Sequence, residues 1–222
     1  MRRKALVIIA ILVIVAPFGA VWWLVRDELA IVRADAAVAP KVPAQMKAAL
    51  IASEGPIFDT RPQSFVVNPF RGRNLVSGGA TAATVLARWT TPRRRMLRWH
   101  LETALVAFAI SREFSGDEVL RVYAHRAYLG RGIEGVEQAS RAYFAKPASS
   151  LTFAEAATIA GMVRSPHYLS PVNHPDRALD RRNKVLKRMR ELRSITEQQY
   201  RDSVREELRV NPALRISQQA GR

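Results

Sequence analysis

The sequence predicts an all-α domain. Three capping boxes, each pairing a Ser or Thr with a Glu or Gln three residues later, mark helix starts. They are Ser115 with Glu118, Thr152 with Glu155, and Thr196 with Gln199. Apolar residues then recur at helical spacing, so helices are expected at 94–113, 116–129, 153–163, 176–193 and 197–208. No segment alternates convincingly between apolar and polar residues, and the best strand candidate, FVVN from Phe65, is too short.

Length and composition limit the function classes. A chain of 222 residues with 48% hydrophobic content can form one globular domain with a real core. There are no cysteines, which excludes disulfides, thiolate metal sites and a cysteine nucleophile. The net charge of +16 points to a polyanionic partner such as nucleic acid, anionic lipid or a phosphorylated substrate. Solvated basic helices in an arginine-rich chain are the alternative.

The N-terminus predicts a membrane anchor. Residues 5–25, ALVIIAILVIVAPFGAVWWLV, contain no charged side chain. A helix needs roughly 20 apolar residues to cross a bilayer, whereas the apolar part of a cleaved signal peptide has only about 7–15. One uncleaved transmembrane helix is therefore expected. Basic residues precede it and a flank of mixed charge follows, which predicts a cytoplasmic N-terminus and an outward-facing domain.

Glu54 is a candidate general base. A helix is expected at 45–53, and Gly55 and Pro56 end it. Glu54 then lies at a helix C-terminus, where the macrodipole disfavours a carboxylate and raises its pKa. The alternative is an ordinary surface glutamate at a helix end, which position alone favours.

The segment from Glu118 to Leu186 contains a series of motifs that bears on the interpretation of Glu54. It contains a YxxxxYxG segment at Tyr123, a GVE turn at Gly135, a YFxKP at Tyr143, an AGM at Ala160 and an RRN at Arg181. In this order the motifs resemble the C-terminal half of the family 51 glycosyltransferases, which polymerise peptidoglycan strands from lipid II. The resemblance implies a lysozyme-like helical core with a membrane-proximal jaw lobe, which is reduced here because the stretch after Phe58 is short.

The resemblance extends upstream to the family's first motif. Met46 to Phe58 resembles it, with Glu54 on the catalytic glutamate. In the family, this glutamate takes the proton from the 4-hydroxyl of one N-acetylglucosamine. The hydroxyl oxygen then attacks the anomeric carbon of the growing chain. Undecaprenyl diphosphate leaves and the configuration inverts. Gly55 stands where the family has aspartate, and Arg61 where it has histidine.

The second motif is a glycine turn into a helix. Ser77 to Trp89 resembles it, and the implied substrate-binding residues are Gly78, Gly79, Thr81 and Arg88. A glycine turn at a helix N-terminus offers free backbone N–H groups to a phosphate. A simple capping loop is the alternative. Two family glutamines, a serine and an asparagine are replaced in this segment.

The third motif combines basic residues with a second glutamate. Pro92 to Phe114 resembles it, and Arg94, Arg95 and Arg98 supply positive charge for the diphosphate. Glu102 is the candidate second catalytic carboxylate, but a gapless count places Thr103 on that position. One residue is about 100° of helix rotation, so the two differ in direction. A regular helix is expected, because bulges are rare. A solvated basic face, or one lying on anionic headgroups, is the alternative for the arginines.

Other patterns are discounted. Gly130, Gly132 and Gly135 form a literal GxGxxG, but it follows a predicted helix rather than a strand, so a dinucleotide site is not expected. The four histidines have no metal-ligand spacing, and no metal site is predicted. Neither S-x-x-K nor K-T-G occurs, so a monofunctional member without a transpeptidase module is expected.

The predicted organisation is an anchor at 1–26, a juxtamembrane linker at 27–45, a family 51-like domain at 46–210 and a basic tail at 211–222. The expected function is peptidoglycan glycosyl transfer at the outer face of a bacterial cytoplasmic membrane. The expected partners are lipid II, the growing strand, the anionic membrane surface and other cell-wall synthesis proteins, but not nucleic acid. No cofactor is required, although Mg²⁺ could assist the diphosphate. The altered motifs leave an alternative: a degenerate relative that binds lipid-linked glycan or cell-wall synthases as a scaffold.

Overall fold

The computed structural model describes residues 22–23, 25–54, 82–91 and 96–214. This part of the chain is helical, and it contains no strand beyond an isolated bridge between Tyr128 and Glu134. The all-α prediction is therefore confirmed for the described residues. A first helix covers 25–38. The others are α2 (Ala44–Glu54), α3 (Ala82–Thr90), α4 (Met96–Glu113), α5 (Gly116–Arg126), α6 (Val136–Phe144), α7 (Phe153–Met162), α8 (Pro175–Glu191) and α9 (Glu197–Arg205), with the 3₁₀ turn η3 (Ala148–Ser150).

All three predicted capping boxes are present. Ser115 N–H donates to the Glu118 carboxylate at 2.8 Å, and Glu118 N–H donates to the Ser115 hydroxyl at 3.3 Å. Thr152 and Thr196 make the same reciprocal bonds at the starts of α7 and α9. These bonds satisfy backbone N–H groups that have no partner inside their own helix. The predicted helix starts at 116, 153 and 197 are confirmed.

The helix α5 ends at Arg126, three residues before its predicted end. The backbone then enters a left-handed turn, with φ of 85° at Gly130, 56° at Arg131, 75° at Gly132 and 83° at Gly135. A Cβ at Gly135 would lie 2.6 Å from the His125 carbonyl oxygen. Glycine is therefore required there for both reasons. The literal GxGxxG is the turn between α5 and α6, as expected, and no strand precedes it.

The chain divides into two compact units. Unit 1 comprises residues 1–38 and 60–119, and unit 2 comprises 39–59 and 120–222. The helix at 25–38 falls within the segment predicted as a linker. Val25, Leu29 and Val32 recur on one of its faces and are buried, and Arg33 forms a two-pronged ion pair with Glu113 of α4. The predicted boundaries at 26, 45 and 210 stay predictions.

Membrane anchoring stays a prediction as well. Most of the predicted span at 5–25 lies outside the described residues, as does the strand candidate at Phe65. None of the helices in the described part is both long and apolar enough to cross a bilayer.

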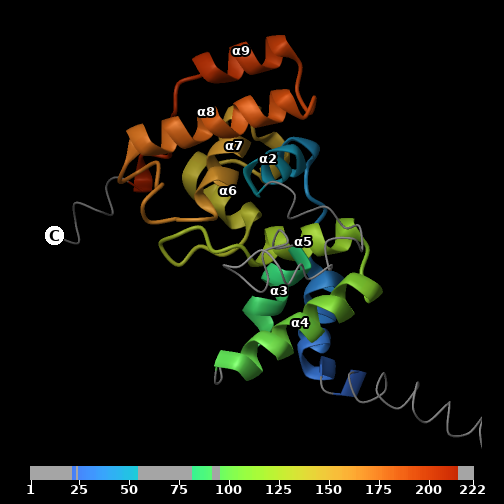
Figure 1. Ribbon diagram of the computed structural model, residues 1–222. Helices are drawn as coiled ribbons and strands as arrows, with labels where there is room; N and C mark the ends of the chain where they lie inside the picture. Colours follow the sequence, from blue (N-terminus) through green and yellow to red (C-terminus); the bar gives the residue numbers. More distant parts are fainter. Residues whose placement is uncertain (1–21, 24, 55–81, 92–95, 215–222) are drawn as a thin grey trace, which may run out of the picture. The chain divides into compact units, whose positions relative to one another are not determined.

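In unit 2, the helices α2, α7 and α8 pack against one another, and α9 runs alongside α8 (Figure 1). The middle helix, α7, is buried along almost its whole length. Most of its buried positions are small: Ala154, Ala156, Ala157, Ala160 and Gly161. Small side chains let neighbouring helices approach closely, because little stands between the backbones. This packing brings the C-terminal end of α2 beside α7 and α8.

In unit 1, the helices α3 and α4 pack against each other. Leu86 of α3 and Val106 and Ile110 of α4 are almost completely buried. The boundary between the two units falls within α5.

Candidate functional site

The helix α2 ends at Glu54, as the sequence predicted. The side chain is half-buried, and its Oε1 atom is buried without a hydrogen-bond partner among the described residues. A buried carboxylate oxygen without a partner is costly and calls for a reason. A general base needs such an oxygen free for the proton that it removes.

The electrostatics of Glu54 combine two opposing effects. Burial raises its pKa above the ordinary value for a glutamate. The positive charges of Arg164 and then Arg181 lower it, as does the Ser53 hydroxyl, but burial is the larger effect. The helix dipole predicted the same direction of the pKa shift, whereas burial is its leading cause in the structure. A base with a raised pKa accepts a proton more readily near neutral pH.

Two helices, α7 and α8, hold the end of α2 in place. The Ser53 hydroxyl donates to the Ala160 carbonyl of α7 at 2.8 Å. The Arg181 guanidinium of α8 donates to the Ser53 carbonyl at 3.2 Å and to the Ser53 hydroxyl at 3.1 Å. Residues more than a hundred positions apart in the sequence therefore fix the residue before Glu54.

Tyr123 completes the surroundings of Glu54. Its side chain is fully buried in α5. Burial and the nearby charge of Glu54 raise the pKa of Tyr123 well above that of a free phenol, against a lowering by Arg164. The phenol therefore stays neutral beside the carboxylate. Tyr123 and Arg181 belong to motifs that carry the family resemblance, but sequence reasoning did not assign them, or Arg164, to the site.

Most of the other predicted site residues fall outside the part of the chain that the structure describes. Gly78, Gly79, Thr81, Arg94 and Arg95 lie outside the described residues. Arg98 belongs to α4, but its side chain is not described, and Arg88 is exposed in the last turn of α3. These residues belong to unit 1 and Glu54 to unit 2, so their joint action on a substrate stays a prediction.

The third motif forms a regular helix. The helix α4 is continuous from Met96 to Glu113 without a bulge. Thr103 is only 5% exposed, and its Oγ1 has no hydrogen-bond partner among the described residues. Glu102, one position away, is half-buried. The expected regular helix is confirmed; which of the two side chains faces a substrate stays a prediction.

The side chains that could bind a metal ion in this cysteine-free chain are His, Asp and Glu. Within the described ranges, no three His, Asp or Glu side chains come together in a way that could hold a metal ion. The described carboxylates therefore do not form a protein cage for Mg²⁺, which usually prefers octahedral oxygen ligands.

Comparison with known proteins gives consistent matches. The family model described as Transglycosylase matches residues 30–190. Penicillin-binding protein 1A of Aquifex aeolicus is 40% identical over 146 residues, which cover 65% of this chain and 20% of that protein. A putative transglycosylase of Cupriavidus necator is 30% identical over 177 residues, which cover 77% of each chain.

Penicillin-binding protein 1A of Escherichia coli is 32% identical over 180 residues, which cover 77% of this chain and 21% of that protein. The chain thus spans about a fifth of the length of these penicillin-binding proteins. A crystal structure of penicillin-binding protein 1A from Haemophilus influenzae, at 31% identity, covers 45% of this chain and 15% of that one with a TM-score of 0.42.

The family model covers most of the chain, including α2 with Glu54 and most of α8 with Arg181. The relative from Cupriavidus necator matches this chain over a similar share of its own length. The protein therefore belongs to the transglycosylase family, glycosyltransferase family 51.

Proposed function

We propose that the protein is a membrane-anchored peptidoglycan glycosyltransferase that polymerises lipid II. The observation that carries this proposal is Glu54. It combines a raised pKa at the end of α2 with a buried carboxylate oxygen that has no hydrogen-bond partner in the described part of the chain. It also stands on the position that the family resemblance assigns to the general base.

Glu54 removes the proton from the 4-hydroxyl of an N-acetylglucosamine. The hydroxyl oxygen attacks the anomeric carbon of the growing chain, a new glycosidic bond forms, and the bond to undecaprenyl diphosphate breaks with inversion. A hydroxyl is a weak nucleophile until a base takes its proton in the transition state, so this step needs a carboxylate that is ionised yet basic. Arg164 and Arg181 favour the ionised form, and burial keeps the carboxylate basic.

We expect residues of unit 1 to bind the diphosphate of the growing chain. Arg88, Arg94, Arg95 and Arg98 would neutralise the diphosphate leaving group, together with the turn at Gly78, Gly79 and Thr81. Glu102 would be the second carboxylate if it faces the substrate. A divalent cation on the diphosphate is optional, and no step depends on it. The uncharged stretch 5–25 would tether the domain to the outer face of a cytoplasmic membrane, where lipid II and anionic lipid are available.

One observation favours a second candidate function. Thr103, which the gapless count aligns with the family's second glutamate, is buried within unit 1. If Glu102 does not replace that carboxylate, the protein could bind lipid-linked glycan, or other cell-wall synthesis proteins, as a scaffold without turnover.

Incubation of the purified full chain with lipid II tests the proposal. Wild type is expected to form glycan polymer, which gel electrophoresis resolves. The Glu54→Gln variant should lose about 10²–10⁴ in rate, since the amide cannot accept the proton. Glu207→Gln, an exposed carboxylate in the same unit, is the matched control and should retain full activity. Binding of lipid II without polymer in wild type would favour the scaffold instead, and equal rates in wild type and Glu54→Gln would remove Glu54 from the mechanism.

A further inference from the structure

We propose that Arg181 is a positioning residue for Glu54, and that Gly161 provides the space in which Arg181 lies. The proposal rests on the proposed function for its effect on turnover. It assigns a role to the AGM and RRN motifs, which lie more than a hundred residues after the base and in which sequence reasoning found no chemistry.

The first argument is the contact that Arg181 makes with α2. The last carbonyl groups of a helix have no partner within the helix, and a basic side chain can satisfy them. Arg181 does this from another helix, because its guanidinium donates both to the carbonyl and to the hydroxyl of Ser53. Ser53 directly precedes Glu54, so the guanidinium fixes the backbone from which the catalytic side chain extends.

The second argument is the space above α7. A Cβ at Gly161 would lie 2.9 Å from the Cγ atom of Arg181, closer than real Cβ contacts. The Arg181 stem therefore crosses α7 at the position that has no side chain. The hydrogen bonds to Ser53 hold the far end of the same side chain, so the stem cannot move aside freely. The absence of a side chain at Gly161 and the hydrogen bonds to Ser53 therefore confine the Arg181 side chain to one path across α7.

Arg181 also places a positive charge near the Glu54 carboxylate. Among the described residues, the Glu54 carboxylate is affected by Arg164 after α7, Arg181 of α8 and Ser53 of its own helix, and its charge acts in turn on Tyr123 of α5. Tyr123 is neutral, so Arg164 and Arg181 supply the positive charge. Arg181 is the one of the two that is hydrogen-bonded to α2. It therefore combines a geometric effect on Glu54 with an electrostatic one.

Two substitutions at Arg181 separate these effects. Arg181→Gln removes the charge and should lower kcat with lipid II by about 10- to 100-fold, as small misplacements of catalytic groups do. It should also move the acidic limb of the pH–rate profile to higher pH, because loss of a positive charge raises the pKa of Glu54. Arg181→Lys keeps the charge but replaces the planar guanidinium, whose Nη2 atom donates both bonds to Ser53, by an ammonium of different shape and reach. The acidic limb should then stay close to its wild-type position, with part of the rate recovered.

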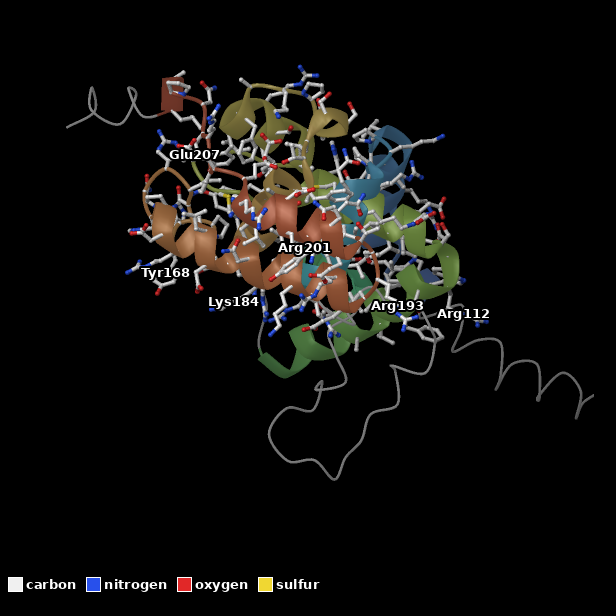
Figure 2. All side chains as sticks on the ribbon, turned by 90° about the horizontal axis from the view of Figure 1, so that it is seen from above. Arg112, Tyr168, Lys184, Arg193, Arg201 and Glu207 are labelled. Carbon is white, nitrogen blue, oxygen red and sulfur yellow. The ribbon has the colours of Figure 1, made fainter. Side chains whose placement is uncertain are left out.

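Gly161→Ala tests the path without changing any charge. The new methyl group should displace Arg181 and lower kcat, although alanine favours a helix more than glycine does. The control is Lys184→Gln, which removes an exposed positive charge one turn along α8 (Figure 2). It should change neither the rate nor the pH profile. If Arg181→Gln and Gly161→Ala behave like Lys184→Gln, the positioning role is wrong.

A second readout does not depend on turnover. Carboxyl ¹³C NMR of labelled protein follows the titration of Glu54 directly, and Glu54→Gln identifies its signal. The Glu54 pKa should be higher in Arg181→Gln than in wild type and unchanged in Lys184→Gln. An unchanged pKa in folded Arg181→Gln would overturn the electrostatic role. If wild type fails to polymerise lipid II, the proposed function fails, while this titration still decides whether Arg181 acts on Glu54.

Discussion

Two sides of α8 carry neighbouring arginines with different tasks. Arg182 is 2% exposed and binds the C-terminal end of α9. It donates to the Glu206 carbonyl at 2.7 Å and to the Val204 carbonyl at 3.0 Å. Arg181 donates its hydrogen bonds to Ser53 of α2. Both side chains satisfy carbonyl groups at the C-terminal end of another helix. Only the helix held by Arg181 ends in a candidate catalytic residue.

The difference shows that burial and hydrogen bonding do not by themselves identify a functional residue. Burial lowers the pKa of both guanidinium groups, and both remain charged because arginine starts from a very high pKa. Arg182 has its carbonyl partners and the nearby charge of Glu206. Arg181 instead has the Glu54 carboxylate and Arg164 nearby, and its Nε atom is buried without a hydrogen-bond partner in the described part of the chain.

The largest effect on stability is expected at Arg182. Arg182→Ala leaves the carbonyls of Val204 and Glu206 without their donor and should destabilise the fold by about 2–4 kcal/mol, since unsatisfied buried groups cost about 1–3 kcal/mol each. Urea unfolding measures this loss. The glycosyltransferase rate per folded molecule should stay near that of wild type, because the hydrogen bonds of Arg182 go to Asn183, Val204 and Glu206 rather than to Ser53 or Glu54. A specific rate that falls as far as that of Arg181→Gln would contradict the division of tasks.

A smaller effect should appear at the capping threonines. Thr196→Ala removes an N-cap and should cost about 1 kcal/mol. Thr152 caps α7 in the same way, but its hydroxyl also donates to the Glu206 carboxylate at 2.7 Å. Thr152→Ala should therefore cost about 0.5–1.5 kcal/mol more, the usual net value of one hydrogen bond. Thermal or urea unfolding compares the two variants.

The Thr152 comparison also has a coupling test. Glu206 receives a hydrogen bond from Arg182 through its carbonyl and from Thr152 through its carboxylate. Residues that share a partner are rarely independent. The loss of unfolding free energy in the double variant Thr152→Ala/Arg182→Ala should therefore differ from the sum of the losses in the two single variants. Strict additivity would show that the two contacts act separately.

The smallest effect on stability, and one of opposite sign, is expected at Glu54. Its pKa is raised in the folded state, so the folded protein binds the proton more tightly than the unfolded chain. The resulting cost is absent below the ordinary glutamate pKa and complete above the raised one. Glu54→Gln should therefore be slightly more stable than wild type at neutral pH, and the difference should shrink as the pH falls. Unfolding at several pH values measures it, and a Glu54→Gln protein that is less stable at neutral pH would contradict the sign.

Local patterns made much of the fold predictable. A capping box acts between residues three positions apart, so Thr152 and Thr196 marked the starts of their helices from sequence alone. Glu54 was expected at a helix end because a glycine and a proline follow it. A separate helix at 25–38 was not predicted, because the uncharged stretch at 5–25 indicated a membrane anchor and Pro40 and Pro43 indicated a linker before the domain. The helix α6 was missed because its N-cap, Gly135, offers no side-chain cap.

The surroundings of Glu54 could not be predicted in the same way. Arg181 lies 128 positions after Ser53, and only the folded packing of α2, α7 and α8 brings them together. The helix dipole gave the correct direction for the Glu54 pKa, but the larger cause, burial, is a tertiary effect. The substitutions in the second and third motifs affect unit 1, where the side chains of several predicted residues lie outside the described part.

The division of unit 2 into two distant stretches of sequence also governs when the site can form. A ribosome makes the N-terminal part of a protein first, and contacts between distant residues form late because the loop between them must close. The helix α2 cannot complete its packing until both α7 and α8 have been synthesised. The environment that raises the Glu54 pKa is therefore expected to arise only after residue 181 has been made, and a chain that stops earlier would carry Glu54 without the surroundings that raise its pKa.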